Sequence, residues 1–189
     1  MTSARRRLPP AARRAEILEA ATELIAASGF NGVPLGAFAA ACGMTKAGLL
    51  HHFPSKEHLL IAVLERRDER DVAAVIGSAE PAADPATSRA VVSRLVERNL
   101  RQRSIVQLYT VLSAEALDPA HPAHDYFRRR LAASRALLAR RLFAWHPAPE
   151  TAAVELLAFL DGLQLNWFRD PDIDFTAQWE AFAAHFYPA

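Results

Sequence analysis

The sequence predicts an all-α fold of about nine helices, and two observations lead to this prediction. Apolar residues recur at spacings of three and four along almost the whole chain, which is the period of a helix, and no stretch alternates as a strand would. Twelve prolines separate these stretches. Because proline breaks helix interiors but is accepted in first turns and loops, the prolines indicate where helices begin and where connections lie.

The first and fourth helices have clear signals at their ends. The apolar spacing predicts a first helix over residues 11–28, which ends at Gly29. A long helix is predicted to begin at Ser55, a residue type that caps helix N-termini, because Leu59 and Leu60 followed by further apolar residues at helical spacing come directly after it.

The remaining helices are predicted from apolar stripes beyond residue 86. Residues 77–86 indicate a turn or a short linker. The helix of the second stripe is expected to begin near Pro122. The four stripes are Ile105, Leu108, Tyr109, Leu112 and Ala116; Phe127, Leu131, Ser134, Leu138 and Leu142; Leu156, Leu160, Leu163 and Trp167; and Phe175, Trp179, Phe182 and Phe186.

Composition and charge narrow the function classes. Hydrophobic residues make up 51% of the chain and charged residues 23%, which is enough for a packed core. No apolar run reaches the ~18 residues of a membrane span, and no signal-peptide core follows the basic N-terminus, so we expect a cytoplasmic protein with no membrane partner. A single cysteine, Cys42, excludes an internal disulfide and is compatible with a reducing cytosol.

Charge is distributed unevenly along the chain. Residues 1–64 carry a formal net charge of +3 and residues 65–189 a net charge of −2. This asymmetry is too mild for a chain that coats nucleic acid with basic residues. The chain has only two lysines, Lys46 and Lys56, and both lie in the first part.

Residues 30–53 predict two short helices with a sharp turn between them. We expect the helices at about Pro34–Cys42 and Thr45–His52, with the turn at Gly43, because glycine accepts the positive φ that a helix-turn-helix requires. A small core would fix the crossing angle, and the second helix would expose a short polar face that suits the major groove of DNA. The alternative is an ordinary helical hairpin with a solvated face. The expected core residues are Phe38, Ala39, Leu49 and Phe53, and the expected exposed residues are Thr45, Lys46, Ala47, Gly48, His51 and His52.

The segment FNGVPLGAFAAACGMTKAGLLHHFPSKEHLL resembles the signature of the TetR family of bacterial regulators. That signature has a glycine–aromatic pair, a helix that ends in Ala-Gly, a short recognition helix and then Phe-Pro-Ser-Lys-Glu-x-Leu. The matching positions are Gly29, Phe30, Phe38, Ala39, Cys42, Gly43, Phe53, Ser55, Lys56, Glu57 and Leu59. The resemblance covers about residues 12–72, a third of the chain.

The resemblance implies roles for individual residues. Thr45 would cap the recognition helix and contact a phosphate, and Lys46 would be the first residue after it. Lys56 would hold its ammonium against the DNA backbone at a helix N-terminus. His51 and His52 are candidates for hydrogen bonds to bases or phosphates, or are simply surface histidines. With the small Gly48, these residues form the predicted DNA-binding set.

The sequence also departs from the family pattern at three places. Leu50 stands where the family has a tyrosine, so a phosphate contact is lost or is made by a histidine. Val33 and Pro34 replace the Thr/Ser pair that caps the second helix, and valine is a poor cap, by ~1 kcal/mol. Gly36 stands where a basic or polar residue is common and costs a similar amount inside a helix.

The family resemblance implies three segments. Residues 1–11 would be a flexible basic arm, residues 12–72 the helix-turn-helix domain with the start of the long fourth helix, and residues 73–189 a helical domain for effector binding and dimerisation. The last two helices would pair with those of a second copy, because their aromatic content exceeds what one helical pair buries; a core within one subunit is the alternative. The predicted interface residues are Leu163, Trp167, Phe168, Trp179, Phe182 and Phe186.

The other helices of this domain are expected to enclose an effector pocket. Amphipathic side chains are the candidates for its lining, although each also suits ordinary core or surface. They are Gln107, Tyr109, Tyr126, Trp145 and Gln164. His121, His124 and Asp125 have a spacing that suits metal ligands but are too few, so we expect no metal and no cofactor.

We therefore expect a homodimeric regulator that binds a pseudo-palindromic DNA operator and is most simply a repressor released by a small molecule. An activator, or a regulator without an effector, belongs to the same class. The alternative from another class is a small-molecule carrier or enzyme with an appended helical head. No catalytic constellation can be picked out of the sequence, so we do not expect an enzyme.

Overall fold

The computed structural model describes residues 9–30, 32–73 and 81–188, and within these ranges all regular structure is helical. The first four helices are α1 (Pro10–Ser28), α2 (Leu35–Ala41), α3 (Lys46–His52) and α4 (Lys56–Asp71). The other five are α5 (Pro85–Arg101), α6 (Arg103–Glu115), α7 (His124–Arg141), α8 (Pro149–Arg169) and α9 (Phe175–Phe186). The nine helices of the described ranges confirm the predicted all-α fold.

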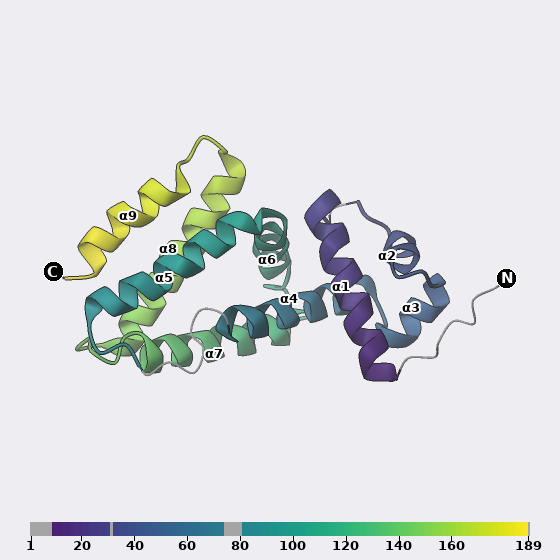
Figure 1. The fold of residues 1–189 in the computed structure, drawn as a ribbon, viewed down its shortest axis with the longest axis horizontal. Helices are drawn as coiled ribbons and strands as arrows, with labels where there is room; N and C mark the ends of the chain where they lie inside the picture. Colours follow the sequence, from purple (N-terminus) through teal and green to yellow (C-terminus); the bar gives the residue numbers. More distant parts are fainter. Residues whose placement is uncertain (1–8, 31, 74–80, 189) are drawn as a thin grey trace.

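The molecule is elongated, with a small head and a larger body (Figure 1). Helices α1, α2 and α3 form the head at one end, and α5, α8 and α9 lie at the other end of the body. Helix α4 begins in the head and extends into the body, where it passes beside α7. Helix α4 therefore runs through both parts.

The predicted helix ends of the head are confirmed. Helix α1 stops at Gly29, which has a φ of 72°, and the turn between α2 and α3 contains Gly43 with a φ of 60°. The Thr45 and Ser55 side chains cap α3 and α4. The predicted small core of Phe38, Ala39, Leu49 and Phe53 is almost completely buried. Local sequence signals thus position α3 on the outside of the head.

Two hydrophobic clusters form the core of the described residues. The first joins α1–α4 to one face of α6, which contributes Ile105, Leu108 and Leu112 as its stripe predicts. The second joins α5, the end of α7, α8 and α9. The predicted boundary after residue 72 falls at the end of α4, but the core of the head continues across it into α6.

The predicted stripe on α7 is only partly right. Leu138 and Leu142 are buried, but Leu131 is 48% exposed. The inward face of α7 instead carries Tyr126 and Arg130, which contact α4. An arginine on that face obscured the apolar pattern, because the side chain is paired with a carboxylate rather than with solvent.

Three expectations involve the ends and connections of the chain. Of the predicted arm, residues 1–8 lie outside the described residues, and residues 10 and 11 belong to the first turn of α1 rather than to an arm. Of the predicted linker, residues 77–80 lie outside the described residues, and residues 81–84 lead into α5 with Asp84 as its cap. Among the described helices, none combines the length and the apolar character that crossing a membrane requires.

Candidate nucleic-acid interface and ligand pocket

The outward face of α3 is short and mixed in character. Leu49 anchors the helix in the core of the head, and the opposite face exposes Lys46, Ala47, Leu50 and His51. Leu50 is 36% exposed, so an apolar side chain lies in the middle of this face. Sequence reasoning treated Leu50 only as a lost tyrosine and missed it as a member of the surface.

The first turn of α3 is held by a compact cap. The Thr45 Oγ1 atom accepts a hydrogen bond from the Gly48 backbone N–H over 3.1 Å. A Cβ atom at Gly48 would lie 3.3 Å from that oxygen, which is a tight contact. Gly48 therefore allows the capping hydrogen bond to form, and the helix surface carries no side chain at this position.

His52 is less available than His51. The His52 residue is half-buried, and its carbonyl accepts a hydrogen bond from Arg14 Nη1 over 3.2 Å. The Arg14 guanidinium also lies over the Phe53 ring, 4.2 Å from the ring centroid. Arg14 thus closes the C-terminus of α3 from α1, where a cation is favourable. Nothing in the local sequence signals this contact across 38 positions.

Lys56 has a partner within the head. Its Nζ atom donates to the Phe30 carbonyl over 3.0 Å and the residue is half-buried. The predicted free ammonium is therefore partly committed to the loop after α1. An ammonium has three N–H donors, so this bond leaves two of them for the proposed contact with a phosphate.

Helix α2 starts without a side-chain cap, as the sequence departures predict. Pro34 occupies the N-cap position, and its side chain makes no capping hydrogen bond. Gly36 is exposed in the first turn, and a Cβ atom at this position would meet nothing within 4 Å.

The body contains a cavity of about 260 Å³ walled by α4 through α8. Tyr109 and Gln164, two of the predicted lining residues, line it. Tyr126, Trp145 and Gln107, the other three predicted residues, do not line this cavity. Tyr126 is buried in the first cluster, Trp145 packs against Phe143 in the second, and Gln107 lies half-buried on α6 outside this cavity.

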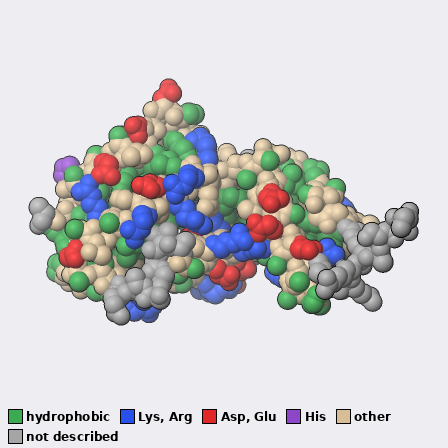
Figure 2. Space-filling view, in the orientation of Figure 1, with side chains coloured by type: hydrophobic (Ala, Val, Ile, Leu, Met, Phe, Trp, Pro, Cys, Tyr) green, Lys and Arg blue, Asp and Glu red, His purple; other side chains and the backbone are tan. Residues whose placement is uncertain are grey.

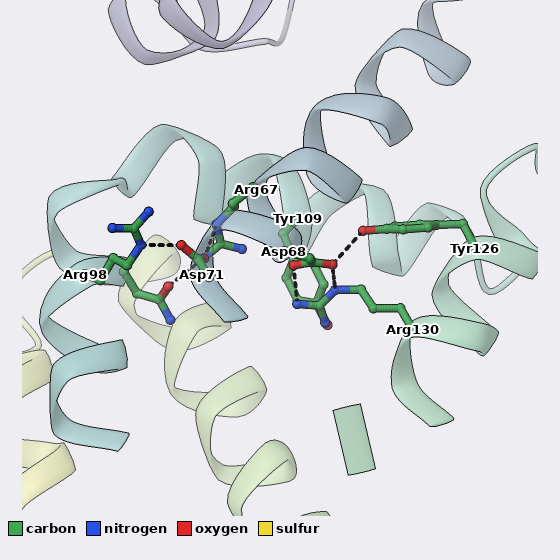
Figure 3. Close-up of polar contacts among 8 residues, drawn as sticks. Arg67, Asp68, Asp71, Arg98, Tyr109, Tyr126 and Arg130 are labelled. Atoms are coloured by element: carbon green, nitrogen blue, oxygen red, sulfur yellow. Dashed lines mark hydrogen bonds and ion pairs between the residues drawn. The ribbon is translucent and has the colours of Figure 1, made fainter. Parts of the chain in front are cut away.

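Charged residues of α4 form the wall of this cavity that faces the head, and sequence reasoning missed them (Figure 3). Arg130 on α7 donates from Nε (2.5 Å) and Nη2 (2.9 Å) to the two carboxylate oxygens of Asp68. The Tyr126 hydroxyl donates to the same carboxylate over 3.1 Å, and burial beside it raises the pKa of Tyr126.

A second carboxylate of α4 lies one turn further along. Asp71 is buried and pairs with Arg98 of α5 and with Arg67, whose Nε is 3.2 Å away. The Arg67 Nη2 atom donates to the Asn99 side chain over 2.5 Å. Ion pairs thus tie the end of α4 to α5 and α7 at the cavity wall. The charged run in the sequence of α4 was the available signal, but it fits a solvated helix face equally well.

A second cavity of about 340 Å³ lies at the junction of head and body. Lys and Arg side chains gather over the middle of the molecule in Figure 2. The arginines that line this cavity are Arg66, Arg67, Arg70, Arg98, Arg101 and Arg103. Glu19 on α1 accepts from Arg66 and Arg70, each over 2.7 Å, which lowers the pKa of Glu19.

The predicted interface residues divide into two groups. Trp179 is 1% exposed within the subunit and donates to the Ser93 hydroxyl over 2.9 Å, and Leu163 is also buried. Both are enclosed within the subunit, Trp179 where α9 packs against α5 and Leu163 in the second hydrophobic cluster, which leaves little of either side chain for a partner. Trp167 and Phe168 are half-buried and lie beneath the Arg103 guanidinium, 4.0 and 5.2 Å from it.

Helices α8 and α9 still present an apolar outer surface. Phe182 is half-buried and stacks on Phe159 with ring centroids 3.8 Å apart, and on Phe186 at 4.9 Å. One stripe of α8 is open beside these rings. It consists of the exposed residues Val154, Ala158 and Leu165, and of Gly162, where a Cβ atom would meet nothing within 4 Å.

The candidate metal residues serve the backbone instead. His121 Nδ1 accepts from the Ala123 N–H over 3.1 Å, and His124 Nδ1 lies 2.9 Å from the Ala116 carbonyl. Across the part of the chain that the structure describes, no group of three or more histidine, cysteine and carboxylate side chains suits a metal ion.

Comparison with solved structures shows the same fold along nearly the whole chain. A TetR transcription regulator from Haloarcula marismortui ATCC 43049 is similar with a TM-score of 0.77 and 18% identity, over 94% of this chain and 97% of that one. A transcriptional regulator from Rhodococcus sp. Rha1 is similar with a TM-score of 0.71 and 23% identity, over 92% and 95% of the two chains.

Sequence similarity is concentrated in the head. The HTH-type transcriptional regulator RutR of Escherichia coli strain K12 is 40% identical over 65 residues, which is 34% of this chain and 31% of RutR. The matched stretch thus spans less than a third of that relative. The family model described as bacterial regulatory proteins, tetR family, matches residues 17–63, which include α2, α3 and the start of α4. Residues 17–63 thus match the tetR family of bacterial regulatory proteins, and the chain as a whole has the fold of the solved TetR regulator it resembles.

Proposed function

We propose that this chain is a sequence-specific DNA-binding repressor that acts as a homodimer and is released by a small molecule. The observation that carries the proposal is the outward face of α3, where Lys46, Ala47, Leu50 and His51 are exposed on a helix anchored by Leu49. A helix of this length, capped and presented at the tip of a head, fits the major groove.

The members of this face would read DNA in different ways. Lys46 and His51 carry hydrogen-bonding groups for base edges, each worth ~1–3 kcal/mol of discrimination where the contact is well formed. Leu50 offers an apolar contact that suits the methyl group of thymine. Thr45, Gly48 and Lys56 would lie against phosphates, and His52 would contribute through the Arg14 bond that holds the end of α3.

Selection of operators from a random DNA library tests this proposal. Wild type, Lys46→Ala, His51→Ala and His52→Ala are compared, with Glu23→Ala on the exposed side of α1 as a matched control. We expect Lys46→Ala and His51→Ala to change the selected sequence, and His52→Ala, which keeps the backbone carbonyl that Arg14 binds, to leave the selected sequence unchanged. Identical consensus sequences for all variants would contradict the role of α3.

The effector would act through α4. Asp68 and Asp71 line the body cavity at one end of this helix, and Lys56 begins its other end in the head. A ligand that rearranges the pairs of Asp68 with Arg130 and of Asp71 with Arg98 would shift α4 and with it the spacing of two heads. To move the population decisively, a ligand must favour one conformer by several kcal/mol.

Dimer formation would use the open stripe of α8 together with Phe182 and Phe186 of α9. Small residues at Ala158 and Gly162 allow close approach of a second helix, and the exposed Val154 and Leu165 supply apolar area. Two heads would then contact half-sites about 34–36 Å apart, as pseudo-palindromic operators require.

A reporter placed downstream of the selected operator distinguishes repression from activation. Expression of the chain is expected to lower the reporter signal, and a variant that lacks Lys46 is expected to restore it. A rise in reporter signal that depends on Lys46 would identify an activator instead.

A further inference from the structure

Two polar groups in the body cavity lack partners within the subunit. Asp161 on α8 lines the cavity, is exposed as a residue, and makes no hydrogen bond or ion pair with any described residue. Gln164 lies one helical turn further on the same face; it is 94% buried, and its Oε1 atom has no hydrogen-bond partner. A buried amide oxygen without a partner costs free energy, so Gln164 favours a ligand that donates a hydrogen bond, and the unpaired carboxylate of Asp161 can accept from the same ligand.

The other charged groups of the cavity are already occupied. Arg130 directs Nε and Nη2 to Asp68 and donates from Nη1 to the Tyr109 hydroxyl over 3.1 Å. Arg67 is held by Asp71 and Asn99. Arg130 therefore offers no free guanidinium edge to an incoming anion. The charge of Arg67 is balanced by Asp71, although its buried Nε makes no hydrogen bond, whereas the carboxylate of Asp161 has no ion-pair partner among the described residues.

The surroundings of Asp161 disfavour an isolated negative charge. Asp161 is exposed as a residue, yet burial of its carboxyl group raises its pKa, and the nearby charge of Arg130 lowers it in part. A bound cation would relieve this cost. Burial also raises the pKa of Tyr109, so its phenol keeps its proton and stays a possible donor at neutral pH.

The rest of the lining is apolar. Five leucines from α5, α7 and α8 line the cavity; they are Leu95, Leu137, Leu138, Leu157 and Leu160. The volume of about 260 Å³ exceeds the roughly 150 Å³ of an engineered apolar cavity that binds benzene. The space accordingly suits a ring or branched chain with a short extension.

We propose that the effector is an amphipathic amine, with a protonated nitrogen between Asp161 and Gln164 and an apolar body against the leucines. The Gln164 carbonyl already lacks a hydrogen-bond partner, so it can accept an N–H of the ligand. This inference rests on the proposed function, because it names the ligand class of the cavity through which that function is regulated.

Four matched probes test the ligand class by titration calorimetry on the full chain at pH 7.5. They are 4-phenylbutylamine, its trimethylammonium analogue, 4-phenylbutan-1-ol and 5-phenylpentanoate. We expect the amine to bind most tightly. Asp161→Asn should weaken amine binding by about ten- to a hundredfold, the range for hydrogen bonds to charged groups, and should leave the alcohol within about twofold.

Two further variants separate the roles of charge and hydrogen bonding. Gln164→Leu should weaken binding of the amine more than binding of the trimethylammonium analogue, which has no N–H to donate. Glu115→Gln, which removes an exposed carboxylate of α6 outside the cavity, should change neither. Tighter binding of the carboxylate probe than of the amine, or an amine affinity unaffected by Asp161→Asn, would overturn the inference.

Operator binding is measured on the same preparation, so that the two proposals fail separately. A protein that binds operator but prefers the alcohol or the carboxylate refutes the amine and leaves the regulator intact. A protein that binds the amine through Asp161 but selects no operator supports the site and refutes the proposed function.

Discussion

Gly43 and Gly36 of the head differ in what their backbone requires. Gly43 has a φ of 60°, in the left-handed region, at the turn between α2 and α3. Gly36 lies in the first turn of α2 with open space around its Cα. The first glycine is therefore needed for the turn, and the second only weakens a helix that already lacks a side-chain cap.

We predict opposite effects of alanine at these positions. Gly43→Ala should lower the free energy of unfolding by about 1–2 kcal/mol, the cost of the left-handed region for a residue with a Cβ atom. Gly36→Ala should raise it by about 0.5–1 kcal/mol through helix propensity and a restricted unfolded chain. Urea unfolding of both variants checks this. Equal signs would show that the head does not constrain Gly43 as described.

Lys56→Ala is predicted to weaken binding to all DNA sequences alike. Removing one phosphate contact should lower the slope of log affinity against log salt concentration by about one. Because Lys56 also bonds the Phe30 carbonyl, Lys56→Met, which keeps the apolar stem, is the companion variant. Salt titrations in a filter-binding assay measure the slope. An unchanged slope in both variants would mean that Lys56 makes no phosphate contact and serves only its bond to the Phe30 carbonyl.

The pH dependence of stability is predicted to change in Asp161→Asn. The folded pKa of Asp161 is raised above the unfolded value of about 4. Between these two pKa values the folded state therefore binds more protons than the unfolded state. The stability of the fold falls as pH rises through this window. Asparagine removes that loss. The variant should therefore gain stability relative to wild type as pH rises through this window, with a constant difference above it. A stability gap that narrows with rising pH would mean that Asp161 has a cationic partner, such as a group from a second subunit.

Residue roles were predictable where the signal was local. Thr45, Ser55, Gly29 and Gly43 were assigned correctly, because caps and turns depend on a few neighbouring residues. The Arg14 contact and the Asp68–Arg130 pair join residues far apart in the chain, and no local pattern encodes their meeting.

At the scale of elements, α4 combines two environments. Its apolar residues Leu59, Leu60 and Val63 belong to the core of the head, whereas Asp68 and Asp71 pair with α7 and α5. Such a helix couples the head to the body through groups that a ligand in the cavity can reach. Helix α7 shows the limit of pattern reading, because its inward face carries Arg130 and the apolar period alone placed Leu131 inside.

Asp68→Asn is predicted to destabilise the fold by about 2 kcal/mol. The change leaves Arg130 without its carboxylate partner and alters the hydrogen bond from the Tyr126 hydroxyl. Because the Asp68 and Arg130 side chains are about a quarter exposed, solvent reduces the cost below that of a fully buried pair. Glu69→Gln, an exposed neighbour on α4, is the control. Chemical denaturation that places both variants within about 0.5 kcal/mol of wild type would contradict the role of this pair.

At the scale of the molecule, the sequence identified the helices of the body but not which aromatic residues face a partner. Trp179 and Leu163 were predicted at an interface, yet both are buried within the subunit, Trp179 against α5. Burial of an aromatic residue follows from how helices are arranged, and a stripe on α9 cannot distinguish α5 from a second copy. The outer surface is marked instead by small and half-buried residues, which carry little signal in a sequence.

We predict that Gly162→Arg produces monomers that remain folded. Gly162 is surrounded by open space within the subunit, so a long cationic side chain is tolerated there but prevents close approach of a second α8. Ala136→Arg on an exposed part of α7 is the matched control and should remain dimeric. Trp179→Arg should instead lose helical content, because it places a charge in the subunit core.

Sedimentation velocity and circular dichroism, measured together, check this prediction. A folded monomer for Gly162→Arg should also lose operator affinity, because two half-sites are then no longer bound by one particle. A normal dimer for Gly162→Arg would move the interface away from the open stripe of α8. Unfolding of Gly162→Arg with an intact Ala158→Glu dimer would lead to the same conclusion, because Ala158 lies on that stripe one turn earlier and is exposed.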